Sequence, residues 1–298
     1  MKILFVTFLA LLGLSRAGAQ VSVELALDQD QFLPNEPLRL AVKITNTSGQ
    51  RLHLGADPSW LTFNVESADG SVVIKNGDVP VVEEFDLESS QMATKHVDLQ
   101  PYFQLNRTDR YKVTATMRVK EWNLIVNGTP ARFDIIHGAE LWSQNFGVMA
   151  ATNAPPESRK YTLLKANYLR EQLRLYLQVS SGDGASIFKV APIGPMVSFS
   201  TPEEQLDRGN RLHVLWQTGA QVFCHLIVNP DGSVDLRDQF DNFNSRPHLA
   251  VNEDGDVLVR GGVRRPKPGE LPTIQLPRGT SAPPAAVPAP ATKAADKK

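Results

Sequence analysis

Two histidines in the second half of the sequence have a spacing that can bring their imidazoles together. The apolar segments 212–217 and 221–225 predict a hairpin around a loop at residues 218–220, which sets His213 and His225 on one face of a sheet. Two imidazoles on one face can bind zinc, but a zinc site needs a third ligand. The other side chains expected on that face are apolar. The pattern therefore favours half-buried structural histidines, and it predicts neither a metal nor a cofactor.

A short internal repeat follows in the same part of the chain. Residues 225–237 and 248–260 repeat each other at an interval of 23 positions, and eight of the thirteen positions are identical. Each copy has an Asn-x-Asp-Gly turn between two apolar segments, with Gly232 and Gly255 at the same place. Glycine adopts the positive φ that a tight hairpin turn requires. Each copy is therefore predicted to form a β-hairpin.

The two repeated turns also carry side-chain oxygens that could bind calcium. These oxygens belong to Asn229, Asp231, Asp235, Asn252, Asp254 and Asp256. A full calcium loop distributes its ligands over about twelve residues and ends with a glutamate that binds through both oxygens. Neither turn has that glutamate, so we interpret both as ordinary hairpin turns without a bound metal.

Groups that serve as nucleophiles or as acid–base pairs occur without the spacing that catalysis needs. Cys224, the one cysteine, lies in an apolar segment, which favours a small buried side chain over a reactive thiol and leaves no intramolecular disulfide. The neighbours Glu83 and Glu84, and likewise Glu203 and Glu204, would point to opposite faces of a strand and are predicted to be solvated. The nucleophile-elbow, zinc-protease, phosphate-loop and dinucleotide signatures are absent from the sequence. No catalytic, cofactor-binding or metal-binding residue is predicted.

Alternating apolar and polar residues predict a β-sandwich over residues 20–138. A period of two places every second side chain on the same face of a strand, where it can be buried. Short strands separated by turn signals, without a helical period of similar length, are typical of antiparallel sandwiches. The alternating segments are residues 21–27, 38–44, 61–65, 96–99, 111–117, 124–126 and 133–135.

Two of these segments carry a resemblance to a known class of domain. Residues 35–48, with Asn-Glu-Pro before the strand and an Asn-rich turn after it, resemble the second strand of bacterial immunoglobulin-like domains. Residues 109–113 are similar to the tyrosine corner of such domains, in which the Tyr111 hydroxyl would cap a crossover. The resemblance implies an immunoglobulin-like fold for residues 20–138. Residues 60–65 are also similar to a segment of the small β-sandwich proteinase inhibitors of bacteria.

A second antiparallel β-domain of stacked hairpins is predicted for residues 139–265. Residues 161–179 fit either one face of a helix or two strands, and the β-rich surroundings favour two strands. Residues 187–190 and 196–199 predict further strands separated by prolines. Residues 203–208 predict one helical turn.

The first residues have the three parts of a secretory signal peptide. A basic start at Lys2 precedes an apolar segment at residues 3–14, and small residues follow at Ala17 and Ala19. The apolar segment is shorter than the roughly 20 residues that a membrane-spanning helix needs. We predict cleavage after Ala19, a secreted or periplasmic protein, and no membrane span in the mature chain.

The last part of the sequence and the overall charge restrict the possible partners. Residues 266–298 contain eight prolines and little periodic apolar sequence, which predicts a disordered tail rich in proline, alanine and lysine. The chain has 31 basic and 32 acidic residues, and this near-neutral balance argues against nucleic acid as a partner.

The sequence favours an exported, non-catalytic binding or structural module of the cell envelope or secretome. Its partner would be a protein or an envelope polymer that the sequence does not identify. A secreted hydrolase with a site at the meeting point of residues 20–138 and 139–265 is the first alternative, because no motif is needed when residues meet only in the fold. A proteinase inhibitor is the second alternative.

Overall fold

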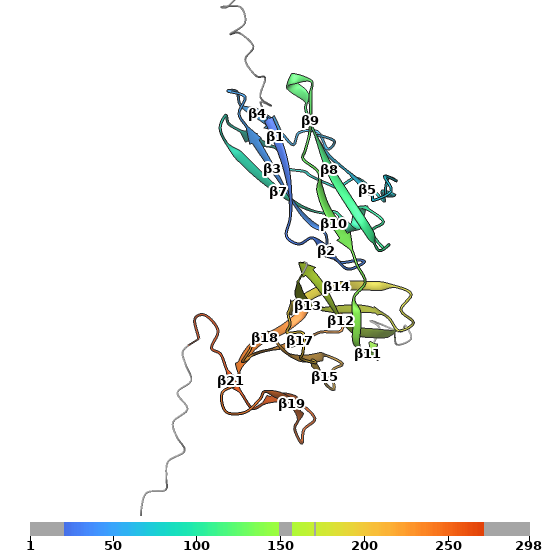
Figure 1. Cartoon of the computed structure of the whole chain (residues 1–298), viewed down its shortest axis with the longest axis vertical. Coiled ribbons are helices and arrows are strands. Elements are labelled where there is room, and N and C mark those ends of the chain that lie inside the picture. Colours follow the sequence, from blue (N-terminus) through green and yellow to red (C-terminus); the bar gives the residue numbers. More distant parts are fainter. Residues whose placement is uncertain (1–20, 149–156, 170, 271–298) are drawn as a thin grey trace, which may run out of the picture. The chain divides into compact units, whose positions relative to one another are not determined.

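The computed structural model describes residues 21–148, 157–169 and 171–270 (Figure 1). Within these residues the elements are β-strands and two short 3-10 helices, η1 (Gln100–Tyr102) and η2 (Lys120–Trp122), so the predicted all-β fold is confirmed. None of the helices in this part of the chain is long and apolar enough to cross a membrane. The predicted signal peptide and most of the predicted tail lie outside the described residues.

The first 115 described residues form two facing sheets and one small ladder (Figure 1). One sheet has the order β1-β3-β7, and the other has the order β2-β10-β8-β5 with β9 beside β8. All pairs are antiparallel except β2 with β10, and β4 pairs with β6 separately. The bounds are β1 (Val21–Leu27), β2 (Gln31–Phe32), β3 (Arg39–Asn46), β4 (Leu52–Leu54), β5 (Leu61–Ser67), β6 (Phe85–Leu87), β7 (Met92–Asp98), β8 (Asp109–Val119), β9 (Leu124–Asn127) and β10 (Ala131–Ile135).

The core of this part lies between the two sheets, as the period of two predicts. In β3, Leu40, Val42 and Ile44 are fully buried, whereas the residues between them are partly exposed. They join buried residues of β5, β8 and β10 in one apolar cluster. Burying each such side chain stabilises the fold by about 1.5–3 kcal/mol. The buried faces of these strands therefore form the apolar layer between the two sheets.

The tyrosine that the sequence places at the start of a late strand makes the predicted local contact. The Tyr111 hydroxyl donates a 2.9 Å hydrogen bond to the backbone carbonyl of Arg107, four residues upstream. A bond of this kind closes the crossover that leads into a strand, which is the contact made in a tyrosine corner. Tyr111 itself is buried and stacks on Phe133 of the neighbouring strand β10.

The following residues form two larger sheets and a separate hairpin (Figure 1). The four-stranded sheet has the order β11-β12-β13-β14, the five-stranded sheet has the order β15-β16-β17-β18-β21, and β19 pairs with β20. A second apolar cluster contains residues from both larger sheets. The bounds are β11 (Ala139–Val148), β12 (Glu157–Leu169), β13 (Gln172–Ser181), β14 (Ile187–Pro195), β15 (Glu203–Leu206), β16 (Leu212–Gln217), β17 (Val222–Val228), β18 (Val234–Asp241), β19 (His248–Val251), β20 (Val257–Arg260) and β21 (Val263–Arg264).

Secondary-structure predictions for residues 139–265 were right where apolar and polar residues clearly alternate. They were wrong near prolines and for the short segment at residues 203–208. Residues 161–179 do form two strands, β12 and β13. The predicted split at Pro192 is wrong, since β14 continues through it to Pro195, and the strand predicted at residues 196–199 is not formed. This proline is tolerated because β14 is an edge strand, where a missing N–H is not needed by a further neighbour. The predicted helical turn at residues 203–208 is also wrong, because Glu203–Leu206 pairs with β16 as a strand.

The strands through Arg264 belong to one compact unit, and Arg265 begins a second unit. In the described part of that second unit, residues 265–270 are exposed, and Glu270 donates a 2.9 Å backbone hydrogen bond to the carbonyl of Lys267. This bond closes a short turn.

Candidate functional site

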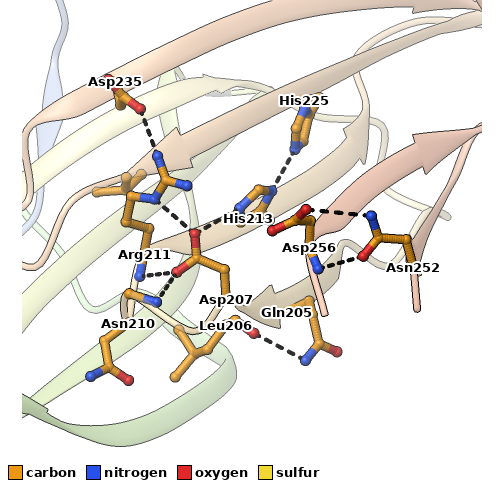
Figure 2. Close-up of polar contacts among 12 residues, drawn as sticks. Gln205, Leu206, Asp207, Asn210, Arg211, His213, His225, Asp235, Asn252 and Asp256 are labelled. Atoms are coloured by element: carbon orange, nitrogen blue, oxygen red, sulfur yellow. Dashed lines mark hydrogen bonds and ion pairs between the residues drawn. The ribbon is translucent and has the colours of Figure 1, made fainter. Parts of the chain in front are cut away.

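The structure brings the two candidate histidines together, in a closed interior. Leu215 pairs with His225, so His213 lies diagonally across from His225 on the same face of the sheet. The Nδ1 atom of His213 and the Nε2 atom of His225 are 3.2 Å apart (Figure 2). The two side chains are only 3% and 5% exposed, which is deeper than the half-buried position predicted.

An acidic residue from the turn before β16 extends this contact. An Asp207 carboxylate oxygen lies 3.5 Å from Nε2 of His213 and accepts a 2.7 Å hydrogen bond from Nε of Arg211 (Figure 2). Arg211 also donates to Asp235, over 3.2 Å. Burial by itself raises the pKa of Asp207, but the hydrogen bonds from Arg211 outweigh it and lower the pKa. Asp207 is therefore an anion that aligns Arg211 and His213.

Burial favours the neutral form of both histidines. Burial lowers the pKa of His213, against the attraction of Asp207. Burial and, to a smaller extent, the neighbouring His213 lower the pKa of His225 to about 4. The described residues contain no group of three or more His, Cys, Asp or Glu side chains that could hold a metal ion.

The repeated turns have the geometry of hairpins. Gly232 and Gly255 have φ values of 79° and 80°, and their N–H groups donate to the carbonyls of Asn229 and Asn252 over 2.8 and 3.0 Å. In the first turn the Asp231 carboxylate accepts a 2.8 Å hydrogen bond from the backbone of Ser233. The hairpin prediction is confirmed for both copies. The copies lie in different sheets, since the second forms only the β19–β20 pair.

The β19–β20 hairpin contacts the five-stranded sheet through Glu203, one of the two adjacent glutamates discussed above. A Glu203 carboxylate oxygen accepts a 2.8 Å hydrogen bond from the backbone N–H of Leu249. The prediction that Glu203 is merely solvated is therefore wrong. Burial raises the pKa of its neighbour Glu204, which is also only partly exposed. This hydrogen bond to β15 offsets part of the conformational entropy that is lost when the β19–β20 hairpin becomes ordered.

The interpretation of the cysteine as a small apolar residue is confirmed. Cys224 is 2% exposed and belongs to the second apolar cluster, on the face of β17 opposite to His225. Burial raises the pKa of its thiol to about 11, so the thiol stays protonated. Cys224 contributes packing and no nucleophile.

A different group of polar residues meets where the loop between β1 and β3 contacts β13. Its central residue, Glu36, is 4% exposed. One carboxylate oxygen accepts a 2.8 Å hydrogen bond from the backbone N–H of Leu33, and the other accepts a 2.8 Å hydrogen bond from the Gln29 amide. The Gln29 amide oxygen in turn accepts a 2.7 Å hydrogen bond from Nη1 of Arg174.

The local sequence explains why Glu36 points inward. Glu36 N donates to the Leu33 carbonyl over 3.1 Å, and Asn35 has a φ of 64°. Proline at the second place and a positive φ at the third are typical of a type II turn, which the segment Leu33-Pro34-Asn35-Glu36 satisfies. The turn brings the Glu36 carboxylate back to the backbone N–H of Leu33, the first residue of the turn. The small apolar cluster of Leu33 with Ala166, Tyr176 and Val190 lies at the same junction.

Burial dominates the electrostatics of Glu36. It raises the pKa of this carboxyl from 4.5 to about 7, although the hydrogen bonds from Leu33 and Gln29 and the charge of Arg174 act in the opposite direction. The charge of Asp28 acts in the same direction as burial. Glu36 therefore changes its charge near neutral pH, unlike an ordinary glutamate.

Beside Glu36 lies a cavity of about 360 Å³, which we call the junction pocket. Arg39 of β3, Arg174 of β13 and Lys189 of β14 supply three basic side chains to its wall. Arg174 is further held over the ring of Tyr168, with its Cζ atom 3.5 Å from the ring centroid. The remaining lining residues are Asp28, Gln29, Glu36, Pro37, Val190, Ala191 and Pro192.

A larger depression of about 400 Å³ lies on the first group of sheets, next to Tyr111. Its acidic residue Asp69 accepts a 2.8 Å hydrogen bond from the backbone of Ser71 and another from the Ser67 hydroxyl. These bonds lower the pKa of Asp69 to about 2 and fasten the loop. The carboxylate of Asp69 is thus already engaged by its own loop, whereas Arg39 and Lys189 in the junction pocket have no ion pair within the described residues.

The sequence did not indicate the junction pocket. Glu36 appeared only as part of the turn before a strand, and Arg174 lay in a segment whose secondary structure was ambiguous. Gln29 and Arg174 are 145 positions apart, so no spacing rule connects them. A glutamate between asparagine and proline at a turn was the one local signal of an inward carboxylate.

Comparisons with known proteins add little to this geometry. No protein family model matches the sequence, and no curated protein matches it significantly. A crystal structure of Spo0M, a sporulation control protein from Bacillus subtilis, is similar with a TM-score of 0.30 and 9% sequence identity, over 59% of this chain and 90% of that chain. A likeness at this level carries neither the fold nor the function of Spo0M to this chain.

Proposed function

We propose that this chain is an exported, non-catalytic binding module of the cell envelope or secretome, and that the junction pocket holds its ligand. The observation that carries the proposal is the convergence of Arg39, Arg174 and Lys189, from three strands, on one open pocket. Fixed polar groups around a concave, partly apolar wall are typical of ligand sites. The signal-peptide pattern of residues 1–19 supports export.

The first group of sheets supports the finer description of an immunoglobulin-like domain. Two facing, mainly antiparallel sheets and the hydrogen bond from Tyr111 to Arg107 are both features of such domains. Domains of this type provide a rigid frame, on which a ligand-binding loop such as residues 28–37 can be held in one conformation. A rigid site loses less entropy on binding than a mobile one.

A secreted hydrolase is the second candidate function, because Glu36 has a raised pKa and lines a pocket. Two observations favour binding over acid–base catalysis. Both carboxylate oxygens of Glu36 already accept hydrogen bonds within the chain. The side chain is also almost completely buried, so a substrate atom has little access to it.

The experiment that separates these functions is retention and product analysis with a panel of neutral and acidic oligosaccharides and short peptides, using the full chain. The variant Ala191→Trp fills the junction pocket from its wall, and Ala68→Trp adds the same side chain on an exposed turn elsewhere. We expect retention without conversion, lost in Ala191→Trp and kept in Ala68→Trp. Equal retention by both variants, or release of cleavage products, contradicts the proposal.

A further inference from the structure

We infer that the junction pocket binds an anionic group, a carboxylate or a phosphodiester, and that this binding is coupled to the protonation of Glu36. The inference rests on the proposal that the junction pocket is the ligand site. It adds the chemical class of the ligand and the way in which pH controls its binding.

The charge of the pocket wall supports an anionic ligand. Arg39 and Lys189 are exposed, and neither is paired with a carboxylate within the residues that the structure describes. Arg174 donates to the neutral amide oxygen of Gln29, so its charge is not cancelled by a direct ion pair there. A guanidinium presents several N–H groups in one plane, which matches the oxygens of a carboxylate or phosphate.

Arg174 is also held in place before a ligand arrives. The 2.7 Å hydrogen bond to Gln29 fixes one edge of its guanidinium, and the ring of Tyr168 supports its face. A long side chain normally loses rotamer freedom when it binds a ligand, and this cost is smaller for a side chain that is already ordered. The guanidinium is thus already ordered when an anion binds.

Glu36 provides the coupling to pH. The charged and titratable groups around it are Asp28 in the same loop, Arg39 on β3, Arg174 and Tyr176 on β13, and Lys189 on β14. Because burial places the pKa of Glu36 at about 7, this carboxyl is partly ionised at neutral pH. Its ionised form competes with an external anion for Arg174 and repels that anion.

The sign of the coupling follows from this competition. An anion in the pocket favours the protonated form of Glu36, so binding takes up a proton when Glu36 is ionised in the free protein. Affinity therefore increases as pH falls from 8 to 6. A single exchanged proton limits the increase to about tenfold per pH unit.

The test is isothermal titration calorimetry of the full chain at pH 6, 7 and 8 with matched anionic and neutral probes. Galacturonate is compared with galactose, and dimethyl phosphate with trimethyl phosphate, which separates a carboxylate ligand from a phosphodiester ligand. Neither anion changes its charge in this pH range, so any pH dependence belongs to the protein. We expect at least one anion to bind about tenfold or more tightly than its neutral partner.

Variants assign the effect to particular residues. Arg39→Gln and Lys189→Gln remove exposed charges without disturbing a buried contact, and each should weaken anion binding by about two- to fivefold. Lys43 lies on the same strand, β3, and forms an ion pair with Glu24. Lys43→Gln is therefore the matched control and should leave anion binding unchanged. Glu36→Gln should remove the increase in affinity between pH 8 and pH 6. Titrations in buffers with different ionisation enthalpies measure the proton uptake directly in the unmodified chain.

The outcomes distinguish this inference from the proposed function. Equal binding of anionic and neutral probes, with loss of both in Ala191→Trp, overturns the anionic class and leaves the pocket as the ligand site. Anion binding that does not change with pH, without proton uptake, overturns the coupling to Glu36. Anion binding that persists in Ala191→Trp overturns both the inference and the proposed location of the site.

Discussion

The side-chain amide of Gln29 donates a 2.8 Å hydrogen bond to the buried carboxylate of Glu36. The oxygen of the same amide accepts a hydrogen bond from Arg174. A neutral amide therefore links the carboxylate of Glu36 to the guanidinium of Arg174, in place of a direct ion pair. Burying a carboxylate costs free energy unless charges or hydrogen bonds compensate. Here the compensation is incomplete, and the raised pKa of Glu36 is the result.

The first prediction concerns the stability of the Glu36→Gln variant. Below about pH 4.5 Glu36 is protonated in both the folded and the unfolded chain, and its contribution to stability is fully present. Between pH 4.5 and about 7 only the unfolded chain ionises, so the wild-type protein loses stability as pH rises through this window. We expect the free energy of unfolding of Glu36→Gln to improve relative to wild type by up to about 3 kcal/mol over that window.

Urea denaturation at pH 4.5, 6 and 8 measures this difference. Glu24→Gln, an exposed glutamate of β1, serves as the control and should show no comparable trend. A difference between Glu36→Gln and wild type that is the same at all three pH values would show that Glu36 does not titrate near neutrality.

The second prediction concerns His225, whose dependence on pH has the opposite sign. Burial lowers its pKa from 6.5 to about 4, so below pH 6.5 the unfolded chain binds a proton that the folded chain does not. Stability is present above pH 6.5 and is lost as pH falls toward 4. We expect His225→Gln to remove up to about 3 kcal/mol of this loss, because an amide does not titrate.

Thermal unfolding monitored by circular dichroism at pH 4, 5.5 and 7 tests the role of His225. His96→Gln changes an exposed histidine of β7 and should unfold like the wild-type protein at each pH. Identical pH profiles for wild type and His225→Gln would contradict the prediction.

The third prediction compares the two turn glycines. A valine at either position must adopt a φ near 80°, which costs about 1–3 kcal/mol. Gly232→Val should cost more than Gly255→Val, because its added carbon would meet Val179 of the buried core at 3.1 Å as well as Lys189 at 2.8 Å. The neighbour of Gly255 is the flexible side chain of Arg208, which can move aside.

Melting temperatures of both valine variants, measured with and without calcium, check this prediction. Asp231→Asn and Asp254→Asn are the matched changes and should be nearly neutral. An amide oxygen at position 231 can accept the same hydrogen bond from Ser233, and in the second turn the acceptor is Asn252. Melting that depends on calcium and loses this dependence in either Asp→Asn variant would restore the calcium interpretation of the turns.

The fourth prediction concerns two truncations near the end of the folded strands. A chain that ends at Arg265 keeps β21 and the 3.0 Å ion pair between Arg264 and Asp238. It should melt within about 1–2 °C of a chain that continues to Lys298, because the predicted disordered tail adds no packed contacts. A chain that ends at Gly262 lacks β21 and leaves Asp238 without Arg264, so it should melt at a clearly lower temperature.

Differential scanning calorimetry of the two truncated chains decides this point. A large loss of stability on ending the chain at Arg265 would mean that residues 266–298 dock onto the sheets. Equal stability for the two truncations would mean that β21 contributes nothing to the five-stranded sheet.

The sequence by itself determined the features of this protein that depend on near neighbours. Alternation over a few residues is enough to predict a strand, since the two faces of a strand differ only in what covers them. The turns at Gly232 and Gly255 were predictable for the same reason, because each involves residues three positions apart. The Tyr111 contact was expected from the resemblance to immunoglobulin-like domains, and it joins residues four positions apart. The approach of His213 to His225 was predictable through one hairpin, although the register set them diagonally rather than face to face.

Only the tertiary structure decided where the polar groups of distant segments meet. Gln29 and Arg174 are joined across 145 positions, and Glu203 reaches Leu249 across 46. Neither pair has a periodicity or a motif, because their contact follows from how sheets and loops pack and not from any local preference of the backbone. The raised pKa of Glu36 likewise depends on burial by residues far away in the sequence, and burial is a property of the folded chain.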